Sequence, residues 1–174
     1  MLQIRTAAPA DYERVRDFYY FLTDAMQDAQ YPPGWEKDVY PTQEFLQQSI
    51  RNGELYLGES EGRLLSCMVT NHQYNAGYRA AQWSVAASDS ELLVIHALGV
   101  HPAYAGRGIA KQMVGQVIDL ARSGGIKTIR LDVLAGNLPA ERAYRKMGFT
   151  CRDTMQLYYA DTGWTAFKLF EYVL

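Results

Sequence analysis

The feature that most constrains this chain is the stretch from Leu92 to Lys111, LLVIHALGVHPAYAGRGIAK. Its first nine residues are almost all apolar, with the polar side chain of His96 in the middle, and they end at the turn signal His101-Pro102. A run this short suits a strand covered on both faces better than a helix. A buried strand is therefore expected to lead, through a turn that contains glycine, into a helix.

That helix is indicated by apolar residues at helical spacing, at Ile109, Met113, Val117, Leu120 and Ala121. Gly106 and Gly108 stand just before it. A helix that begins on small residues presents free backbone N–H groups and the positive end of its dipole, which suits a phosphate group. The same glycines also suit a plain turn. The stretch contains neither a Walker loop nor a complete dinucleotide-binding fingerprint.

Composition narrows the class of protein. At 174 residues the chain is expected to form one domain, residues 1–174, with a substantial core. A net charge of −2 argues against nucleic acid or an anionic membrane as the main partner. Two cysteines make no disulfide framework, no His/Cys cluster has zinc spacing, and the N-terminus has no long apolar region. We therefore expect a cytoplasmic protein without a metal.

The other segments predict one mixed α/β sheet flanked by helices. Helices are expected from Pro9 to Met26, after Thr42 and after Asn137. The segment from Tyr31 to Pro41 is expected to be a structured loop, and residues 72–90 either a loop or a second part of a pocket. Strands are expected at residues 2–6, 54–59, 64–70, 127–134, 150–159 and 164–174.

The second half of the chain carries a family motif. Asn137, Ala140, Tyr144 and Gly148-Phe149 lie some thirty residues beyond the glycine turn. Together, the two segments resemble the GNAT superfamily of acetyl-CoA-dependent N-acetyltransferases. The resemblance implies a mostly antiparallel sheet that splays between its fourth and fifth strands, here residues 92–100 and 127–134. It also implies that acetyl-CoA is the co-substrate and that its pantetheine arm lies in the splay.

The family's pyrophosphate motif, Gln/Arg-x-x-Gly-x-Gly/Ala, has its last two defined positions at Gly108 and Ala110. Its first falls on Ala105, so a side-chain donor is missing there and phosphate affinity is either kept by the backbone or reduced. The resemblance assigns acetyl-CoA contacts to Leu98, Gly99, Val100, Gly106, Arg107, Gly108, Ile109, Ala110, Lys111, Asn137, Ala140 and Tyr144. Within this set, the Leu98 backbone N–H is the expected oxyanion donor.

Acetyl transfer to an amine needs a proton donor for the leaving thiolate and a route for the amine's proton. Tyr144 matches the family's proton donor, although it can also simply pack its helix on the sheet. The Glu that many members carry on the fourth strand is Val94 here. His96, two residues on and on the same strand face, is a candidate base or a core histidine. Glu171 and a chain of water molecules are the other candidates.

The acceptor pocket is expected where the family varies. Tyr31, Trp35, Tyr40 and Trp83 can hold an alkylammonium by cation–π contact, or can pack their loops. The expected function is acetylation of a primary amine on a small molecule, by direct attack in a ternary complex. Acetylation of a protein or peptide N-terminus and a non-catalytic acyl-CoA sensor are the alternatives. A homodimer is an expectation by family analogy alone, and no residue pattern names the acceptor.

Overall fold

The computed structural model describes residues 1–174, which form a single seven-stranded sheet in the order β1-β2-β3-β4-β5-β7-β6. All neighbouring strands run antiparallel except β4 and β5, which are parallel. The strands are β1 Gln3–Thr6, β2 Leu55–Ser60, β3 Arg63–Asn71, β4 Leu92–Val100, β5 Thr128–Leu134, β6 Thr150–Tyr159 and β7 Gly163–Val173. This mixed, mostly antiparallel α/β sheet confirms the expected fold class.

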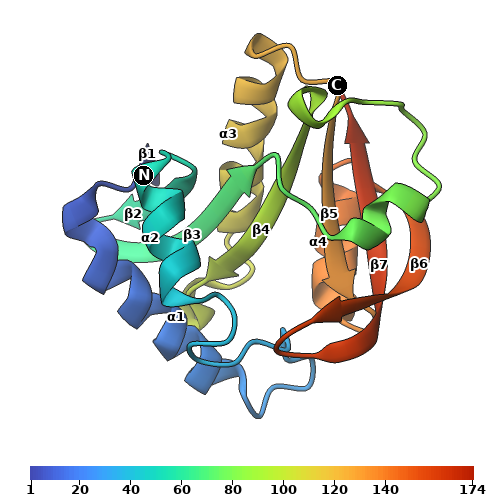
Figure 1. Ribbon diagram of the computed structural model, residues 1–174. Coiled ribbons are helices and arrows are strands. Elements are labelled where there is room, and N and C mark those ends of the chain that lie inside the picture. Colours follow the sequence, from blue (N-terminus) through green and yellow to red (C-terminus); the bar gives the residue numbers. More distant parts are fainter.

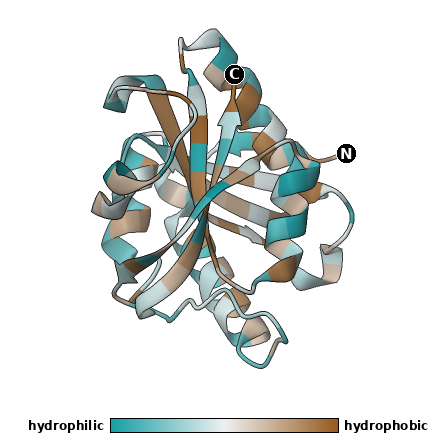
Figure 2. Ribbon diagram, turned by 90° about the vertical axis from the view of Figure 1, so that its right-hand side faces the viewer, coloured by the Kyte–Doolittle hydropathy of each residue, from teal (hydrophilic) through white to brown (hydrophobic).

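Helices cover both faces of the sheet (Figure 1). On one face, α1 (Tyr12–Met26) and α2 (Gln43–Arg51) pack on β2, β3 and β4. On the other, α3 (Ile109–Ser123) and α4 (Leu138–Lys146) cover a larger core. Apolar residues are concentrated in the strands between these layers, as burial of apolar surface requires (Figure 2). None of the helices combines the length and the apolar character that crossing a membrane would require.

Local sequence signals explain where several elements begin and turn. The Thr42 side chain accepts a hydrogen bond from the backbone N–H of Phe45 and so caps α2, as predicted. Glu61 and Gly62 both have positive φ, 51° and 73°, which is the conformation of a tight two-residue hairpin turn. The predicted strands and helices differ from the observed bounds by only a few residues at their ends.

The sheet splits in its middle. β4 and β5 pair only at their first residues, from Leu92 opposite Thr128 to Val94 opposite Arg130. Beyond Val94, β4 continues to Val100 beside β3, while β5 continues to Leu134 beside β7. The two halves of the sheet therefore diverge, which confirms the predicted splay.

Residues 73–90, here called the strap, leave β3, cross the face of β5, β7 and β6 opposite α4, and return to β4 (Figure 1, green). The strap contains only two short 3-10 turns, Ala76–Ala80 and Asp89–Glu91, the second of which runs into β4. It covers a third apolar cluster, in which Tyr78 packs with Leu92, Val94, Leu157, Phe167 and Leu169. At Gly77 the strap approaches β6 so closely that a Cβ would stand 2.4 Å from the Leu157 side chain.

Candidate active site

A β-bulge shapes β4 at the point of divergence. Cys67 pairs with Gly99 and Val69 with His96, so one residue of β3 lies opposite both Ala97 and Leu98. Ala97 has a φ of 48°, an uncommon value for a residue with a Cβ, and its carbonyl accepts a 2.7 Å hydrogen bond from the Tyr19 hydroxyl. The bulge interrupts the pairing at Leu98, whose N–H is the predicted oxyanion donor.

The bulge also changes which side chains share a face. Leu93 and Ile95 pack toward α3, and after the bulge Leu98 and Val100 pack there too. Ala97 packs toward α1 instead, and Trp35 and Leu22 from that side approach the position where Gly99 lacks a side chain. The predicted cofactor residues of β4 are therefore divided between the two faces at the splay.

The start of α3 leaves four backbone N–H groups without a partner. Gly108 is the N-cap, with a φ of 78°, and no side chain caps the helix. The first bond into the helix is donated by Gln112, so Gly108, Ile109, Ala110 and Lys111 donate to no group in the protein. This is a backbone site for an anion, and it does not depend on a side chain at Ala105.

The side chain of Arg107 packs on a neighbouring aromatic ring. Its guanidinium sits 5.1 Å from the ring centroid of Tyr104, in a cation–π contact. Gly106, with a φ of 76°, forms the turn between them and the helix. The backbone is therefore the main donor set that the structure offers to a phosphate here.

At the start of α4, Asn137 accepts a hydrogen bond from the Ala140 backbone N–H, which confirms the predicted cap. Two turns later, Tyr144 packs its ring against Phe149 and Phe170. Its side chain is buried, and its hydroxyl makes no hydrogen bond within the protein. Burial, and then the charge of Asp132, raises the pKa of Tyr144, so the phenol stays protonated at neutral pH.

His96 lies half-buried on β4. Its Nε2 is 2.9 Å from Asn71 Oδ1, which also accepts a 2.9 Å bond from the Gln73 backbone N–H. Because the second bond identifies Oδ1 as the acceptor, Nε2 carries the proton and Nδ1 keeps a lone pair. Burial lowers the pKa of His96 from 6.5 to about 4, so the ring is neutral at physiological pH but is a weak proton acceptor.

Glu171 is buried on β7 between two arginines. It pairs with Arg130 at 3.4 Å and with Arg152 at 3.1 Å, and it accepts hydrogen bonds from the Ser84 backbone and hydroxyl. Burial alone would raise its pKa, but the bonds from Ser84 and the two positive charges hold the pKa of Glu171 below its ordinary value. A carboxylate held in this way is poorly suited to take up a proton.

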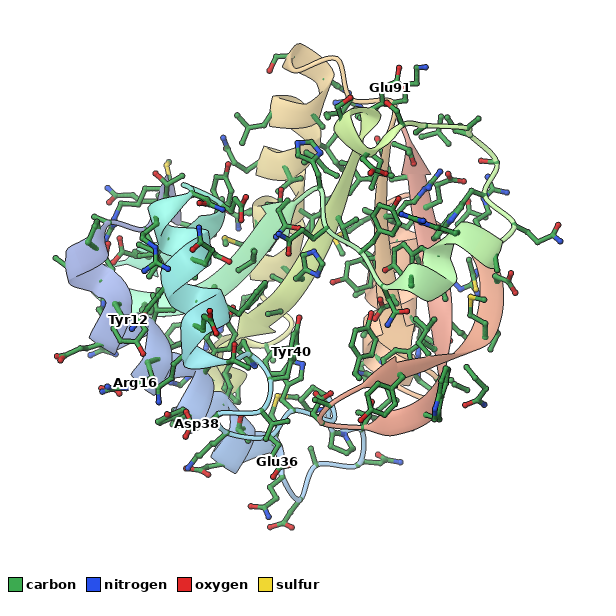
Figure 3. All side chains as sticks on the ribbon, in the orientation of Figure 1. Tyr12, Arg16, Glu36, Asp38, Tyr40 and Glu91 are labelled. Atoms are coloured by element: carbon green, nitrogen blue, oxygen red, sulfur yellow. The ribbon has the colours of Figure 1, made fainter.

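The predicted acceptor aromatics separate into different environments. Trp35, Tyr40, Phe45 and His96 form a row of ring contacts at 6.0 to 6.4 Å. Tyr40 lies at the lower end of the opening between the two halves, whereas Glu36 and Asp38 of the same loop point outward (Figure 3). Tyr31 joins no ring contact or side-chain hydrogen bond, although it is part of that loop.

Trp83 belongs to the strap, and its ring face is already occupied. The guanidinium of Arg130 lies 4.3 Å from the ring centroid, and the indole N–H donates to the Tyr78 carbonyl at 2.7 Å. The cation–π contact expected with a substrate is therefore made by the protein itself. Trp83 supports the wall of the site through Tyr78.

Asp132 on β5 was not among the predicted site residues. Its Oδ2 accepts hydrogen bonds from Tyr78 and Tyr159, both at 2.7 Å, and it enters no ion pair. Burial raises the pKa of Asp132, against the effect of the two tyrosines. Burial, and after it the charge of Asp132, raises the pKa of Tyr40 and of Tyr144.

A signal for Asp132 was present in the sequence. It lies on β5 on the face opposite Ile129, Leu131 and Val133, so alternation alone exposes it to whatever covers that face. The sequence does not reveal that Tyr78, from the strap, and Tyr159, from β6, both donate hydrogen bonds to Asp132.

A family model described as the acetyltransferase (GNAT) family matches residues 18–149. N-alpha-acetyltransferase RimI of Mycobacterium tuberculosis is 35% identical over 75 residues, which are 43% of this chain. The matched region spans less than half of that relative, 46% of its length.

Solved structures share the fold over the whole chain. NAA60 of Arabidopsis thaliana, in complex with acetyl-CoA, superposes with a TM-score of 0.73 at 20% identity, covering 100% of this chain and 99% of that one. The yncA protein of Salmonella typhimurium, solved with its cofactor acetyl-CoA, gives 0.71 at 19% identity, covering 100% and 94%. With a family model that covers most of the sequence and a splayed sheet of the same fold, this chain belongs to the GNAT family of acetyltransferases.

Proposed function

We propose that this protein transfers the acetyl group of acetyl-CoA to a primary amine of a small molecule, by direct attack in a ternary complex. The observation that carries the proposal is the Tyr144 hydroxyl, which makes no hydrogen bond within the protein and keeps its proton, because burial and then the negative charge of Asp132 raise its pKa. Asp132 itself lies on β5 just beyond Arg130, the last residue that pairs with β4. A proton donor and a carboxylate at one opening are what amine acetylation uses.

The free N–H groups of Gly108 to Lys111 would hold the pyrophosphate of acetyl-CoA. The splay next to Leu98 and Asn137 would receive the pantetheine arm. Acetyl-CoA supplies an activated acyl group as a thioester. The Leu98 N–H, beside the bulge, is the group we assign to stabilise the oxyanion that forms on the thioester carbonyl.

In the transfer, the amine nitrogen forms a bond to the carbonyl carbon and the carbon–sulfur bond breaks. Tyr144 gives its proton to the departing thiolate. A phenol and a thiol have ordinary pKa values of about 10 and about 8.5, and burial of the phenol keeps its proton in place until the negative charge appears. The acceptor nitrogen loses two protons in all. The one that leaves after the attack restores the phenol of Tyr144, and the one that an ammonium must lose before the attack needs a second group.

We assign that second role to Asp132. An alkylammonium, with an ordinary pKa of about 10, arrives charged and needs both a docking site and a proton acceptor. Asp132 has Oδ2 occupied by Tyr78 and Tyr159, which leaves Oδ1 for the ammonium. His96, with a pKa of about 4, is the weaker candidate, and Glu171 is assigned a structural role.

The small-molecule assignment rests on a contact that closes the acceptor face. A Cβ at Gly34 would stand 2.9 Å from the Thr162 methyl, so the loop before α2 touches the turn between β6 and β7. Acetylation of a peptide N-terminus remains the second candidate, because the similar protein RimI is named an N-alpha-acetyltransferase. A peptide needs an open groove across this contact.

Two measurements test the proposal. Calorimetry should show saturable binding of acetyl-CoA, and a panel of small amines and peptides, with release of free thiol as the readout, should show turnover of at least one small amine. Preference for peptides would replace the small-molecule assignment. Binding without turnover of any acceptor would leave the acyl-CoA sensor as the function.

A further inference from the structure

The strap lacks the backbone bonds that hold the other segments in place. The backbone–backbone bonds of residues 73–90 are local, such as Tyr78 to Asn75 and Trp83 to Ala81, and none reaches a strand. Its links to the sheet all involve side chains, for example Asn75 Nδ2 to the Tyr158 carbonyl at 3.0 Å. The position of the strap therefore depends on a few specific side-chain contacts.

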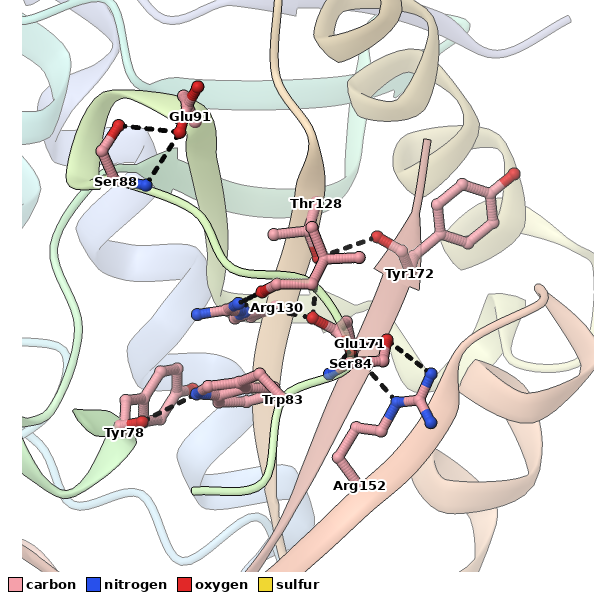
Figure 4. A network of polar contacts seen from close by, with 11 residues as sticks. Tyr78, Trp83, Ser84, Ser88, Glu91, Thr128, Arg130, Arg152, Glu171 and Tyr172 are labelled. Atoms are coloured by element: carbon pink, nitrogen blue, oxygen red, sulfur yellow. Dashed lines mark hydrogen bonds and ion pairs between the residues drawn. The ribbon is translucent and has the colours of Figure 1, made fainter. Parts of the chain in front are cut away.

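The main anchor is the carboxylate of Glu171 (Figure 4). Its Oε2 accepts from the Ser84 backbone N–H at 2.9 Å and from the Ser84 hydroxyl at 2.6 Å. Arg130, whose contact with Glu171 spans 3.4 Å, also donates to the Val85 carbonyl at 2.6 Å. Arg152 also links Glu171 to the strap, because it donates one hydrogen bond to the Glu171 carboxylate and another to the Ser84 hydroxyl.

This anchor is costly for a purely structural device. The Glu171 side chain is 0% exposed and that of Arg130 only 7%. Arg130 Nε is also buried without any hydrogen-bond partner. Apolar residues of similar volume often stabilise a protein as well as a buried ion pair does. Apolar contacts do not fix the orientation of a backbone segment, whereas hydrogen bonds do. The anchor makes hydrogen bonds to two successive residues of the strap, Ser84 and Val85.

From the anchor, contacts lead directly to Asp132. Arg130 stacks on Trp83, the indole N–H of Trp83 donates to the Tyr78 carbonyl, and the Tyr78 hydroxyl donates to Asp132 Oδ2. Each step is a direct contact with its geometry defined at both ends. Tyr78 itself is 2% exposed, so its ring cannot adopt another position unless the strap moves.

We infer that Glu171 is a positioning residue that acts through the strap. By holding the strap in place, Glu171 fixes the position of Tyr78. The Tyr78 hydroxyl then holds the Asp132 carboxylate so that Oδ1 is free for the acceptor amine. The inference rests on the proposed function for the role of Asp132. The contacts from Glu171 to Asp132 do not depend on that role.

A double-mutant cycle tests the inference. Glu171→Gln removes the charge that holds both arginines, and Tyr78→Phe removes only the bond to Asp132. With the best amine of the panel, each should lower kcat/KM for the amine by about tenfold, while acetyl-CoA affinity changes by less than about twofold. Because both act through one contact, the double variant should be no worse than the poorer single variant. Additive losses would overturn the inference.

Glu59→Gln is the matched control. Glu59 is also a carboxylate between two arginines, Arg5 and Arg14, but it lies on β2 at the far side of the sheet. Its variant should keep kcat/KM for the amine. An equal loss in Glu59→Gln would show that any weakened ion-pair network lowers activity, and the inference would fail.

An NMR titration of the Asp132 carboxyl carbon needs no acceptor. The groups that donate hydrogen bonds to Asp132 are Tyr78 from the strap and Tyr159 from β6. The other titratable groups linked to its charge are Tyr40, Tyr144 and Asp161. Since the bond from Tyr78 lowers the pKa of Asp132, Tyr78→Phe and Glu171→Gln should both move the midpoint to higher pH. An unchanged midpoint in Glu171→Gln would overturn the positioning role, whether or not any amine is acetylated. Failure to acetylate any amine would refute the proposed function, which is a separate outcome.

Discussion

Replacing His96 by glutamine tests whether this histidine is a neutral core residue or a titrating base. Glutamine keeps an N–H group that can reach Asn71 but cannot titrate in this range. Burial lowers the pKa of His96 from 6.5 to about 4, so between these values the unfolded chain binds a proton that the folded chain does not. The stability that His96 confers is therefore present above pH 6.5 and is lost as the pH falls toward 4.

The size of the effect follows from the same two values. A difference of about 2.5 pKa units corresponds to about 3 kcal/mol once the pH is below both values. Between about pH 7.5 and about pH 5, the linkage relation gives a loss of about 2 kcal/mol. Carboxylates such as Asp11 and Glu91, whose pKa values are lowered to about 2, contribute equally to the wild type and the variant, so the difference between the two proteins isolates His96.

The assay is urea unfolding at both pH values, followed by the fluorescence of the three tryptophans. The wild type should lose about 2 kcal/mol more than His96→Gln on going from about pH 7.5 to about pH 5. His101→Gln controls for the loss of a histidine as such. Equal losses in wild type and His96→Gln would refute the reasoning, and an ionisation near pH 6.5 in kcat/KM that disappears in His96→Gln would restore His96 as the base.

Three further predictions concern single groups. Tyr144→Phe removes only the unpaired hydroxyl, so turnover should fall by about 10²-fold with little change in acetyl-CoA affinity; equal turnover would mean that water supplies the proton. Gly108→Ala should destabilise the protein by about 1 kcal/mol, because Gly108 has a φ of 78°. Gly115→Ala, inside the same helix and with equally open space around it, should stabilise the protein by about 0.5–1 kcal/mol. Changes of the same sign in urea unfolding would contradict this pair of predictions. Asn137→Ala removes the cap of α4 and should cost about 1 kcal/mol, or about 2–4 °C in Tm, and an unchanged Tm would show that the cap contributes nothing.

The backbone of the candidate site could be predicted because its signals are local. β4 was predicted with the bounds Leu92 to Val100 that it has, and Asn137 caps α4 as expected. Apolar periodicity, capping residues and turn glycines act over a few residues, so they can be recognised without knowing the fold. The family motif depends on the same short segments, which is why the splayed sheet was also anticipated.

The surroundings of the catalytic groups could not be predicted in this way. Strand alternation places His96 and Leu98 on one face, but the bulge at Ala97 separates them, and a hydroxyl from Tyr19 holds that bulge. The burial that lowers the pKa of His96 comes from segments remote in sequence. Of the two readings of His96, candidate base or core histidine, this lowered pKa favours the neutral core side chain.

The sequence by itself determined the family, the order of elements and the local geometry of the helix starts, because each depends on neighbouring residues. Only the tertiary structure decided the roles of the charged groups. Asp132 meets Tyr78 and Tyr159, and Glu171 meets Arg130 and Arg152, across separations of 19 to 54 residues. A carboxylate's pKa and its function depend on such neighbours and on its burial, and chain folding alone brings them together.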